Sequence, residues 1–240
     1  MAGHSKWANM KHRKGRADAK RGKAFTRVTR EIINAVKQGG PDPKNNPKLR
    51  SAILKAKEVN LPNENIERNI KKASHADQEA YTDFIYELYG YGGVGLLVIG
   101  MTDNKNRLAS DIRIATNKRG GTVAAPGSVL FNFEHKGLIH IEGPGSDRAE
   151  DLFMVSSEAG AEDIEPEEEG VTLVVTAPEE LIQVKDVLTE AGFTVREAEQ
   201  QYLPKVRMAC SEEQAQLNQA LIDWLEELDD VDEVIHNRED

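Results

Sequence analysis

The stretch LIHIEGPGSDRAEDLFMVSSEAGAEDI, residues 138–164, decides the fold together with VTLVVTAPEELIQVKDVLTEAGFTVREAEQQY, residues 171–202. Each stretch has a short apolar run, then apolar residues at helical spacing, then a second extended run. The helical parts end at Gly160 and Gly192, because glycine commonly ends a helix. Two such halves give the order β-α-β-β-α-β, which is the ferredoxin-like pattern. The sequence therefore predicts an inserted ferredoxin-like α/β domain over residues 135–203.

The sequences before and after this inserted domain are expected to contribute strands and helices to one further domain. Residues 82–101 contain an alternating stretch, a glycine-rich turn and an apolar run, which predict a β-hairpin. A helix is expected from the polar cap at residues 102–104 to about residue 119, followed by a strand over residues 129–133. This first part lacks the partners that a complete sheet domain needs.

The C-terminal part supplies those partners. It is expected to open with a strand at residues 206–209 and to continue with a helix behind the capping box Ser211-Glu-Glu-Gln214. A strand over residues 231–236 ends it. We therefore predict a middle α/β domain made of residues 79–134 plus 204–240.

Residues 1–78 predict a basic arm followed by a helical bundle. Apolar residues at helical spacing predict a first helix over residues 18–38. Asn46 followed by Pro47 is a typical start for a second helix, and a third contains Ile66 and Ile70. Taken together, the expected fold is α+β with three domains: a helical bundle, then two α/β domains with the third domain inserted into the second.

Positive charge is concentrated at the start of the chain. Residues 1–72 contain nineteen Lys or Arg and six acids, a net charge of +13, whereas the remaining residues carry −23, which gives −10 for the whole chain. The split predicts a front that faces nucleic acid and an acidic body. The lone Cys210 excludes an intrachain disulfide, and the most apolar run, residues 94–101, is too short to span a bilayer. We expect a cytoplasmic protein with no membrane partner.

The basic arm and the first helix contain the predicted nucleic-acid-binding residues. Lys and Arg gain most against a polyanion, where they release condensed counterions. The ring of Trp7 could stack on a base or pack on the bundle, and both interpretations stay open. The alternative for the whole set is a solvated charged face. The predicted contacts are Lys6, Trp7, Lys11, Arg13, Lys14, Arg16, Lys20, Arg21, Lys23, Arg27 and Arg30.

A second candidate surface lies just before the helix of the middle domain. Asp103, Asn104, Lys105 and Arg107 could form an interdomain functional surface. The same residue types are typical of a helix N-terminus with an Asn cap, and the spacing favours that structural role.

The sequence contains no motif in which catalytic or metal-binding residues have the spacing that an enzyme or a metal site needs. Residues 143–147 superficially resemble a phosphate loop, but acidic neighbours and the lack of a following lysine indicate a strand-to-helix turn. The six histidines are scattered and Cys210 has no histidine nearby in sequence. We therefore expect no catalytic residue, no metal site, no cofactor and no small-molecule substrate. The acidic run 162–169 predicts a solvated loop, with a basic protein partner as the alternative.

Four motifs resemble the YebC/PmpR family, which also includes mitochondrial translational activators. They read GHSKW, GGPDP, LPNENI and TDNKNR at residues 3–7, 39–43, 61–66 and 102–107. The resemblance implies a helical N-terminal domain with two α/β domains and a role in gene expression. It implies a non-enzymatic DNA-binding transcriptional regulator. The alternative is a translation factor that is associated with RNA or the ribosome.

Overall fold

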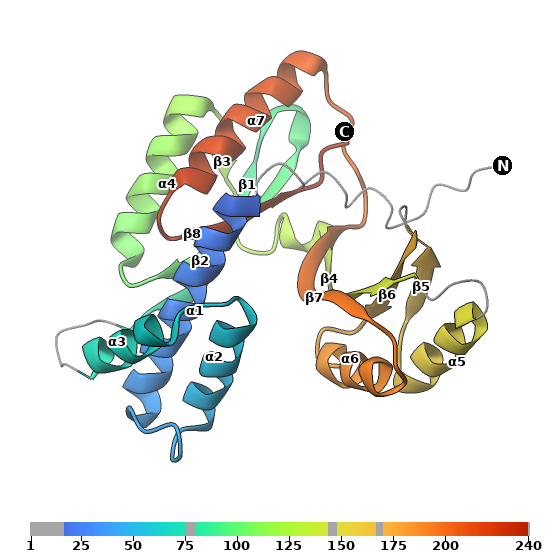
Figure 1. Ribbon diagram of the computed structural model, residues 1–240. Helices are drawn as coiled ribbons and strands as arrows, with labels where there is room; N and C mark the ends of the chain where they lie inside the picture. The colour runs from blue at the N-terminus through green and yellow to red at the C-terminus, as the bar shows by residue number, and fades with distance from the viewer. Residues whose placement is uncertain (1–16, 75–79, 144–147, 167–169, 240) are drawn as a thin grey trace. The chain divides into compact units, whose positions relative to one another are not determined.

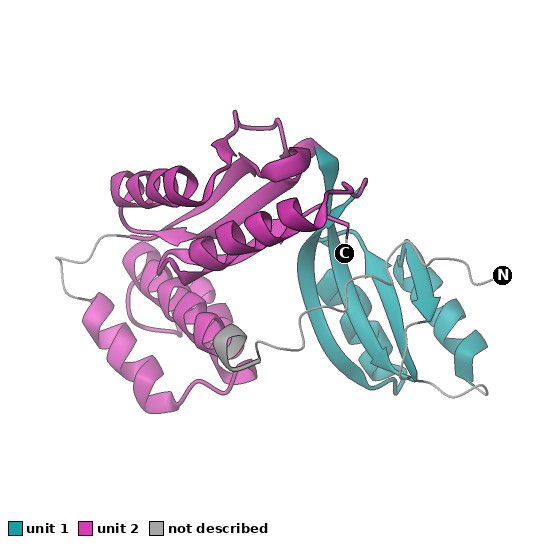
Figure 2. Ribbon diagram, turned by 90° about the horizontal axis from the view of Figure 1, so that it is seen from above, with its two compact units in different colours: residues 1–14, 132–205 teal, residues 15–131, 206–240 magenta. Residues whose placement is uncertain are grey.

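The computed structural model describes residues 17–74, 80–143, 148–166 and 170–239, with the side chains from residue 22 onward. The fold is α+β, as predicted, with N-terminal helices and two antiparallel sheets. The described residues form two compact units (Figure 2). One contains residues 132–205, and the other contains the described residues up to 131 together with 206–239. The N-terminal helices fall in the same unit as the first sheet, and the division into three domains stays a prediction.

Three helices begin the larger unit: α1 (Ala17–Gly39), α2 (Pro47–Glu58) and α3 (Asn63–Ala73). Ile32, Leu49 and Ala56 are fully buried in their common core. The predicted cap Asn46 joins two of the helices. Its Oδ1 accepts a hydrogen bond from the Leu49 N–H at 3.0 Å, and its Nδ2 donates to the Ala35 carbonyl at 2.7 Å. One side chain thus satisfies the start of α2 and fixes the end of α1 beside it.

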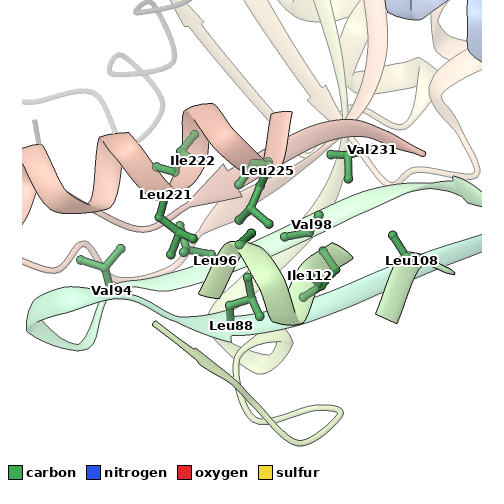
Figure 3. Packing of buried hydrophobic residues seen from close by; sticks show 12 residues of the cluster. Leu88, Val94, Leu96, Val98, Leu108, Ile112, Leu221, Ile222, Leu225 and Val231 are labelled. Carbon is green, nitrogen blue, oxygen red and sulfur yellow. The ribbon is translucent and has the colours of Figure 1, made fainter. Parts of the chain in front are cut away.

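The first sheet has the strand order β3-β1-β2-β8. Its strands are β1 (Thr82–Tyr89), β2 (Gly95–Thr102), β3 (Thr122–Val123) and β8 (Val231–His236). The helices α4 (Lys105–Arg119) and α7 (Glu212–Glu227) complete this part, and α7 begins at the predicted capping box. Figure 3 shows Leu96 and Val98 of β2 packed with Ile112 of α4 and Leu221 of α7. Residues from both ends of the chain therefore build one core.

Two predicted strands of this part are wrong. Residues 130–132 form the short 3-10 helix η4 (Leu130–Asn132), and the strand β4 begins only at Phe133. The reason is a set of hydrogen bonds to Glu87 that the local sequence does not reveal. Residues 206–209 contain only an isolated bridge from Met208 to Arg238 in place of a strand.

The second sheet, in the unit of residues 132–205, has the order β5-β6-β4-β7, and each of its pairs is antiparallel. Its elements are β4 (Phe133–Glu142), α5 (Ala149–Ala159), β5 (Asp163–Pro166), β6 (Val171–Thr176), α6 (Leu181–Glu190) and β7 (Val195–Pro204). This is the ferredoxin-like arrangement that the repeated pattern predicts. Both helices lie on one face of the sheet (Figure 1), where Leu152 and Val184 pack against Ile139 and Val174.

Glu87 is a buried carboxylate at the end of β1, with 6 % of its surface exposed. Its oxygens accept hydrogen bonds from the N–H groups of Gly127, Val129 and Leu130 at 2.5, 2.6 and 2.7 Å. Burial raises the pKa of Glu87, but these three bonds outweigh burial and bring the pKa below its ordinary value. The ionised carboxylate therefore stabilises this turn and the start of η4 more than the protonated carboxyl group does.

We expect Glu87→Gln to lower the free energy of unfolding by about 2–3 kcal/mol at neutral pH, because an amide replaces an ionised acceptor of three bonds. The folded pKa is lowered, so this stabilisation is complete above the unfolded value of about 4.3 and is lost as the pH falls through the folded pKa. Urea unfolding followed by circular dichroism across the acidic range measures it. The difference between the two proteins should shrink on acidification; a constant difference would contradict the assignment. Glu142→Gln, at an exposed site, is the control.

Candidate nucleic-acid interface

The predicted contacts fall into three groups in the structure. Lys6, Trp7, Lys11, Arg13, Lys14 and Arg16 lie outside the described residues. Lys20 and Arg21 belong to the first turns of α1, where only the backbone is described. Lys23, Arg27 and Arg30 have described side chains, and Lys23 is half-buried.

The environment of Arg30 argues against the predicted phosphate contact. Its side chain is buried, and its two terminal nitrogens donate to the carbonyls of Met101 at 3.1 Å and Asp229 at 2.6 Å. The carboxylates of Asp230 and Asp232 lie 3.9 and 3.8 Å away. The guanidinium group therefore has its partners inside the protein, where a nucleic-acid phosphate does not reach it.

Arg27 is also held by carboxylates, which argues against a phosphate contact at this position as well. Its Nη1 donates to Asp232 at 2.6 Å, and Asp83 and Glu31 lie within 3.3 and 3.5 Å. Burial lowers the pKa of Arg27, but the three acids outweigh burial and raise it. Burial raises the pKa of Asp232 more than the neighbouring cations lower it. Arg27 is thus an ion-pair partner of the first sheet.

Asp229, Asp230 and Asp232 among these partners belong to the acidic turn, residues 226–232, which runs from the end of α7 into the start of β8. Asp230 is its most buried carboxylate and accepts from the Thr102 hydroxyl at 2.9 Å and from Arg107 at 2.7 Å. The Asp230 carbonyl accepts from the Met101 N–H at 3.1 Å. At Gly100, a Cβ atom would lie 2.0 Å from that carbonyl oxygen, so the close approach requires glycine. Sequence reasoning missed this turn, although its run of acids between a helix and a strand was visible.

The second candidate surface has structural partners for three of its four residues. Asn104 is the N-cap of α4, and its Oδ1 accepts from the N–H groups of Asn106 and Arg107. The Arg107 side chain binds Asp103 at 2.8 Å in addition to Asp230, and these carboxylates raise its pKa. Lys105 is exposed. The contacts favour the capping role, and an interdomain functional surface stays a prediction.

Two depressions flank the acidic turn. One has a volume of about 250 Å³ and is lined by Arg107, Leu108 and Asp111 together with the turn. The other, of about 410 Å³, lies between the turn and α1, where Lys23 and Thr26 line it. Glu227 and Asp229 belong to both linings and oppose the entry of a phosphate group.

Neither depression contains a group of metal ligands. Across the part of the chain that the structure describes, no three His, Cys, Asp or Glu side chains are placed to hold a metal ion. None of the described helices combines the length and the apolar character that crossing a membrane requires.

Known proteins resemble this chain along its whole length. A family model described as the TACO1/YebC protein N-terminal domain matches residues 5–76, and one described as the TACO1/YebC second and third domain matches residues 81–238. The chain belongs to the TACO1/YebC family. The family resemblance read from the four sequence motifs is therefore confirmed.

Relatives in this TACO1/YebC family carry regulatory names. A probable transcriptional regulatory protein of Protochlamydia amoebophila is 59% identical, over 99% of this chain and 96% of the relative. One of Chlamydia pneumoniae is 56% identical, over 99% of both chains. The crystal structure of a conserved hypothetical protein from Aquifex aeolicus is 43% identical with a TM-score of 0.74, covering 97% of this chain and 96% of that one.

Replacing Arg30 tests its internal role. We expect Arg30→Ala to lower the free energy of unfolding by about 3–5 kcal/mol, because buried carboxylates and carbonyls lose their partner. Arg27→Ala should cost about 1 kcal/mol or less, because the Arg27 side chain is 37% exposed. Chemical denaturation of both variants measures the difference. An Arg30→Ala protein as stable as the wild type would show that the hydrogen bonds of the Arg30 guanidinium group do not stabilise the fold.

Proposed function

We propose that this TACO1/YebC protein is a non-enzymatic, nucleic-acid-binding regulator of gene expression that acts as a DNA-binding transcriptional regulator. The observation that carries the proposal is the charge of +13 on residues 1–72 against −23 on the remainder. The regulatory names of relatives that are more than half identical support the same role. A duplex is a polyanion, so the basic segment gains affinity by releasing counterions while the acidic body repels phosphate.

The positions of Arg27 and Arg30 narrow the proposed interface. Both arginines are held by the acidic turn, so the contact moves to the N-terminal side of Arg27. It then comprises the bases of residues 6–16 together with Lys20, Arg21 and Lys23 at the start of α1. Lys20 and Lys23 are three residues apart in the sequence of α1.

The proposed contacts recognise phosphate and carry little sequence information. Contacts from Lys and Arg to the phosphate backbone set position and orientation, whereas base edges are read in the grooves. We therefore expect this surface to bind unrelated duplexes with similar affinity.

The alternative is a translation factor that is associated with RNA or the ribosome. The rings of His4 and Trp7 beside the basic residues favour it, because flat rings stack on the unpaired bases of single-stranded RNA. Parallel titrations with duplex DNA and with single-stranded RNA of equal length distinguish the two, since stacking predicts tighter binding of RNA at equal salt.

The salt dependence of binding tests the proposed interface. About five phosphate contacts give a slope of roughly −5 in log affinity against log salt on duplex DNA. We expect replacement of Arg13, Lys14 and Arg16 by Ala in the full chain to flatten this slope by about 2 to 3 units. The same variant should bind unrelated DNA sequences more weakly, and by a similar factor for each sequence. Fluorescence anisotropy with a labelled duplex measures both quantities.

The matched control removes the same charge elsewhere. Arg113, Lys118 and Arg196 are exposed bases outside residues 1–72, and their replacement by Ala should leave affinity and slope close to those of the wild type. Equal losses of DNA affinity in the two triple variants would mean that the net charge of the protein, and not the position of these bases, determines binding. Unchanged binding by the first variant would show that the arm is not the contact surface.

A further inference from the structure

The helical bundle has a basic surface of its own, beyond the arginines that the acidic turn holds. Residues 32–74 contain nine Lys or Arg and four acids, a net charge of +5. Most of this excess comes from α2 and the loop before it, residues 40–46, because residues 32–57 contain Asp42 as their only acid. The bases within residues 32–57 are Lys37, Lys44, Lys48, Arg50, Lys55 and Lys57.

The exposed side of α2 carries four of these bases in two rows. The other side of the helix packs in the core of the bundle. Residues seven apart on a helix lie on the same side, about 10 Å from each other. The rows are Lys48 with Lys55 and Arg50 with Lys57, and all four side chains are exposed. Leu54 lies between the rows with 61% of its surface exposed, so the face is basic on both flanks and apolar in the middle.

Most of these bases are not neutralised by an acid, in contrast to the arginines at the acidic turn. Lys55 is paired with Glu31 at 2.9 Å. Lys48 and Arg50 bind neutral oxygens, which belong to the Gln38 side chain and to two loop carbonyls. In the described part of the chain, no carboxylate oxygen lies within 4 Å of the charged nitrogens of four bases: Lys44, Lys48, Arg50 and Lys57. These four charges therefore remain for an external anion.

Two acids lie within this surface and leave it positive. Asp42 belongs to the loop, where its oxygens accept hydrogen bonds from the Lys44 N–H at 2.9 Å and from Asn45 Nδ2 at 2.8 Å. Glu58 lies at the C-terminal end of α2. When both are counted, residues 32–62 have six bases against two acids, a net charge of +4.

The loop of residues 40–46 is held in one conformation by side chains at the start of α2. Asn46 donates from Nδ2 to two carbonyls, at 2.7 and 2.9 Å. Arg50 donates from Nη1 to two carbonyls of the loop itself, at 2.8 and 3.0 Å. Figure 1 shows the loop at the end of the bundle where α1 and α2 meet. Lys44 is thus presented beside α2 by a loop that needs little ordering when a ligand binds.

Helix α3 carries a different pattern of charge in the same bundle. Glu64 and Glu67 come four residues before Arg68 and Lys71, which is the spacing at which opposite charges attract on a helix surface. Alternating charge is typical of a helix face that is exposed to solvent. On α2, by contrast, bases of one sign repel one another and gain most against a polyanion.

We propose that the exposed face of α2 and the loop of residues 40–46 form a second phosphate-binding surface for the nucleic acid. This inference rests on the proposed function, because it adds a contact to the polyanion that the basic arm binds. Phosphate contacts from two parts of the chain fix the orientation of a protein on a duplex. Leu54 supplies an apolar contact between the basic flanks, which suits a sugar or a thymine methyl group.

Replacement of Lys44, Lys48 and Lys57 by Ala in the full chain tests this surface. Fluorescence anisotropy with a labelled duplex should show a slope of log affinity against log salt that is flatter by about 2 to 3 units. Affinity at 0.1 M salt should fall on the order of a hundredfold. All three lysines are exposed, so circular dichroism and the urea midpoint should match the wild type. A slope and affinity equal to those of the wild type would overturn the proposal.

The matched control removes the same charge from α3 of the same bundle. We expect replacement of Arg68, Lys71 and Lys72 by Ala to leave the slope within about one unit of the wild type, because acids alternate with these bases. Equal losses in the α2 and α3 variants would show that the position of the bases within the bundle does not matter, and would overturn the assignment to α2.

Lysine footprinting of the wild-type chain tests the surface without a substitution. An N-hydroxysuccinimide ester acetylates accessible lysines, and mass spectrometry compares the labelling with and without saturating duplex. We expect Lys44, Lys48 and Lys57 to be labelled less in the presence of duplex, and Lys71 and Lys72 to be labelled equally in both conditions. Labelling of the first three lysines that duplex does not change would overturn the proposal.

Comparison of the α2 variant with the variant of residues 13–16 separates this inference from the proposed function. Weaker binding by both variants supports both surfaces. Weaker binding by the arm variant alone overturns the α2 surface and leaves the proposed function intact. Weaker binding by the α2 variant alone supports this inference and contradicts the arm as the contact surface. A wild-type chain that does not bind duplex would overturn the proposed function, and this inference with it.

Discussion

The larger unit depends on guanidinium groups that meet the acidic turn, residues 226–232. Arg30 from α1 and Arg107 from α4 both lie within 4 Å of the same buried carboxylate, Asp230. Removing these charges from water is costly, and the hydrogen bonds to carboxylate and carbonyl oxygens offset that cost. Gly100 allows the turn to approach β2 closely enough for the Asp230 carbonyl to bind Met101. A site so fully satisfied holds α1, α4 and β8 in one arrangement.

The acidic turn also divides the basic residues into those with partners inside the protein and those that remain for an external partner. In the bundle, Arg27 and Arg30 are committed to internal partners, although the sequence places them in the same basic series as the arm. Among the predicted contacts, those that are left for an external polyanion precede Arg27. The protein thus carries its basic excess in residues 1–72 and its acidic excess in the remainder.

Local signals in the sequence predicted most of the fold. Asn46 with Pro47, and Ser211 with Gln214, act through hydrogen bonds within a few residues, and both helices begin where these caps place them. The repeated β-α-β halves carry their own periodicity, so the second sheet could be predicted as well. The strand expected at residues 129–133 was wrong because Glu87, more than forty residues earlier, binds its backbone. The internal partners of Arg27 and Arg30 could not be predicted for the same reason, since Asp232 and Asp229 lie about 200 residues away in sequence.

The central claim is that the acidic turn makes the N-terminal helices and the first sheet one cooperative structure. Native-state hydrogen exchange with mass spectrometry measures this most directly. The amides around Ile32 in α1 and those of β8 should exchange with the same free energy of opening, and Asp230→Ala should lower both by the same amount. Exchange of α1 through a smaller opening of its own, unchanged by Asp230→Ala, would contradict the account.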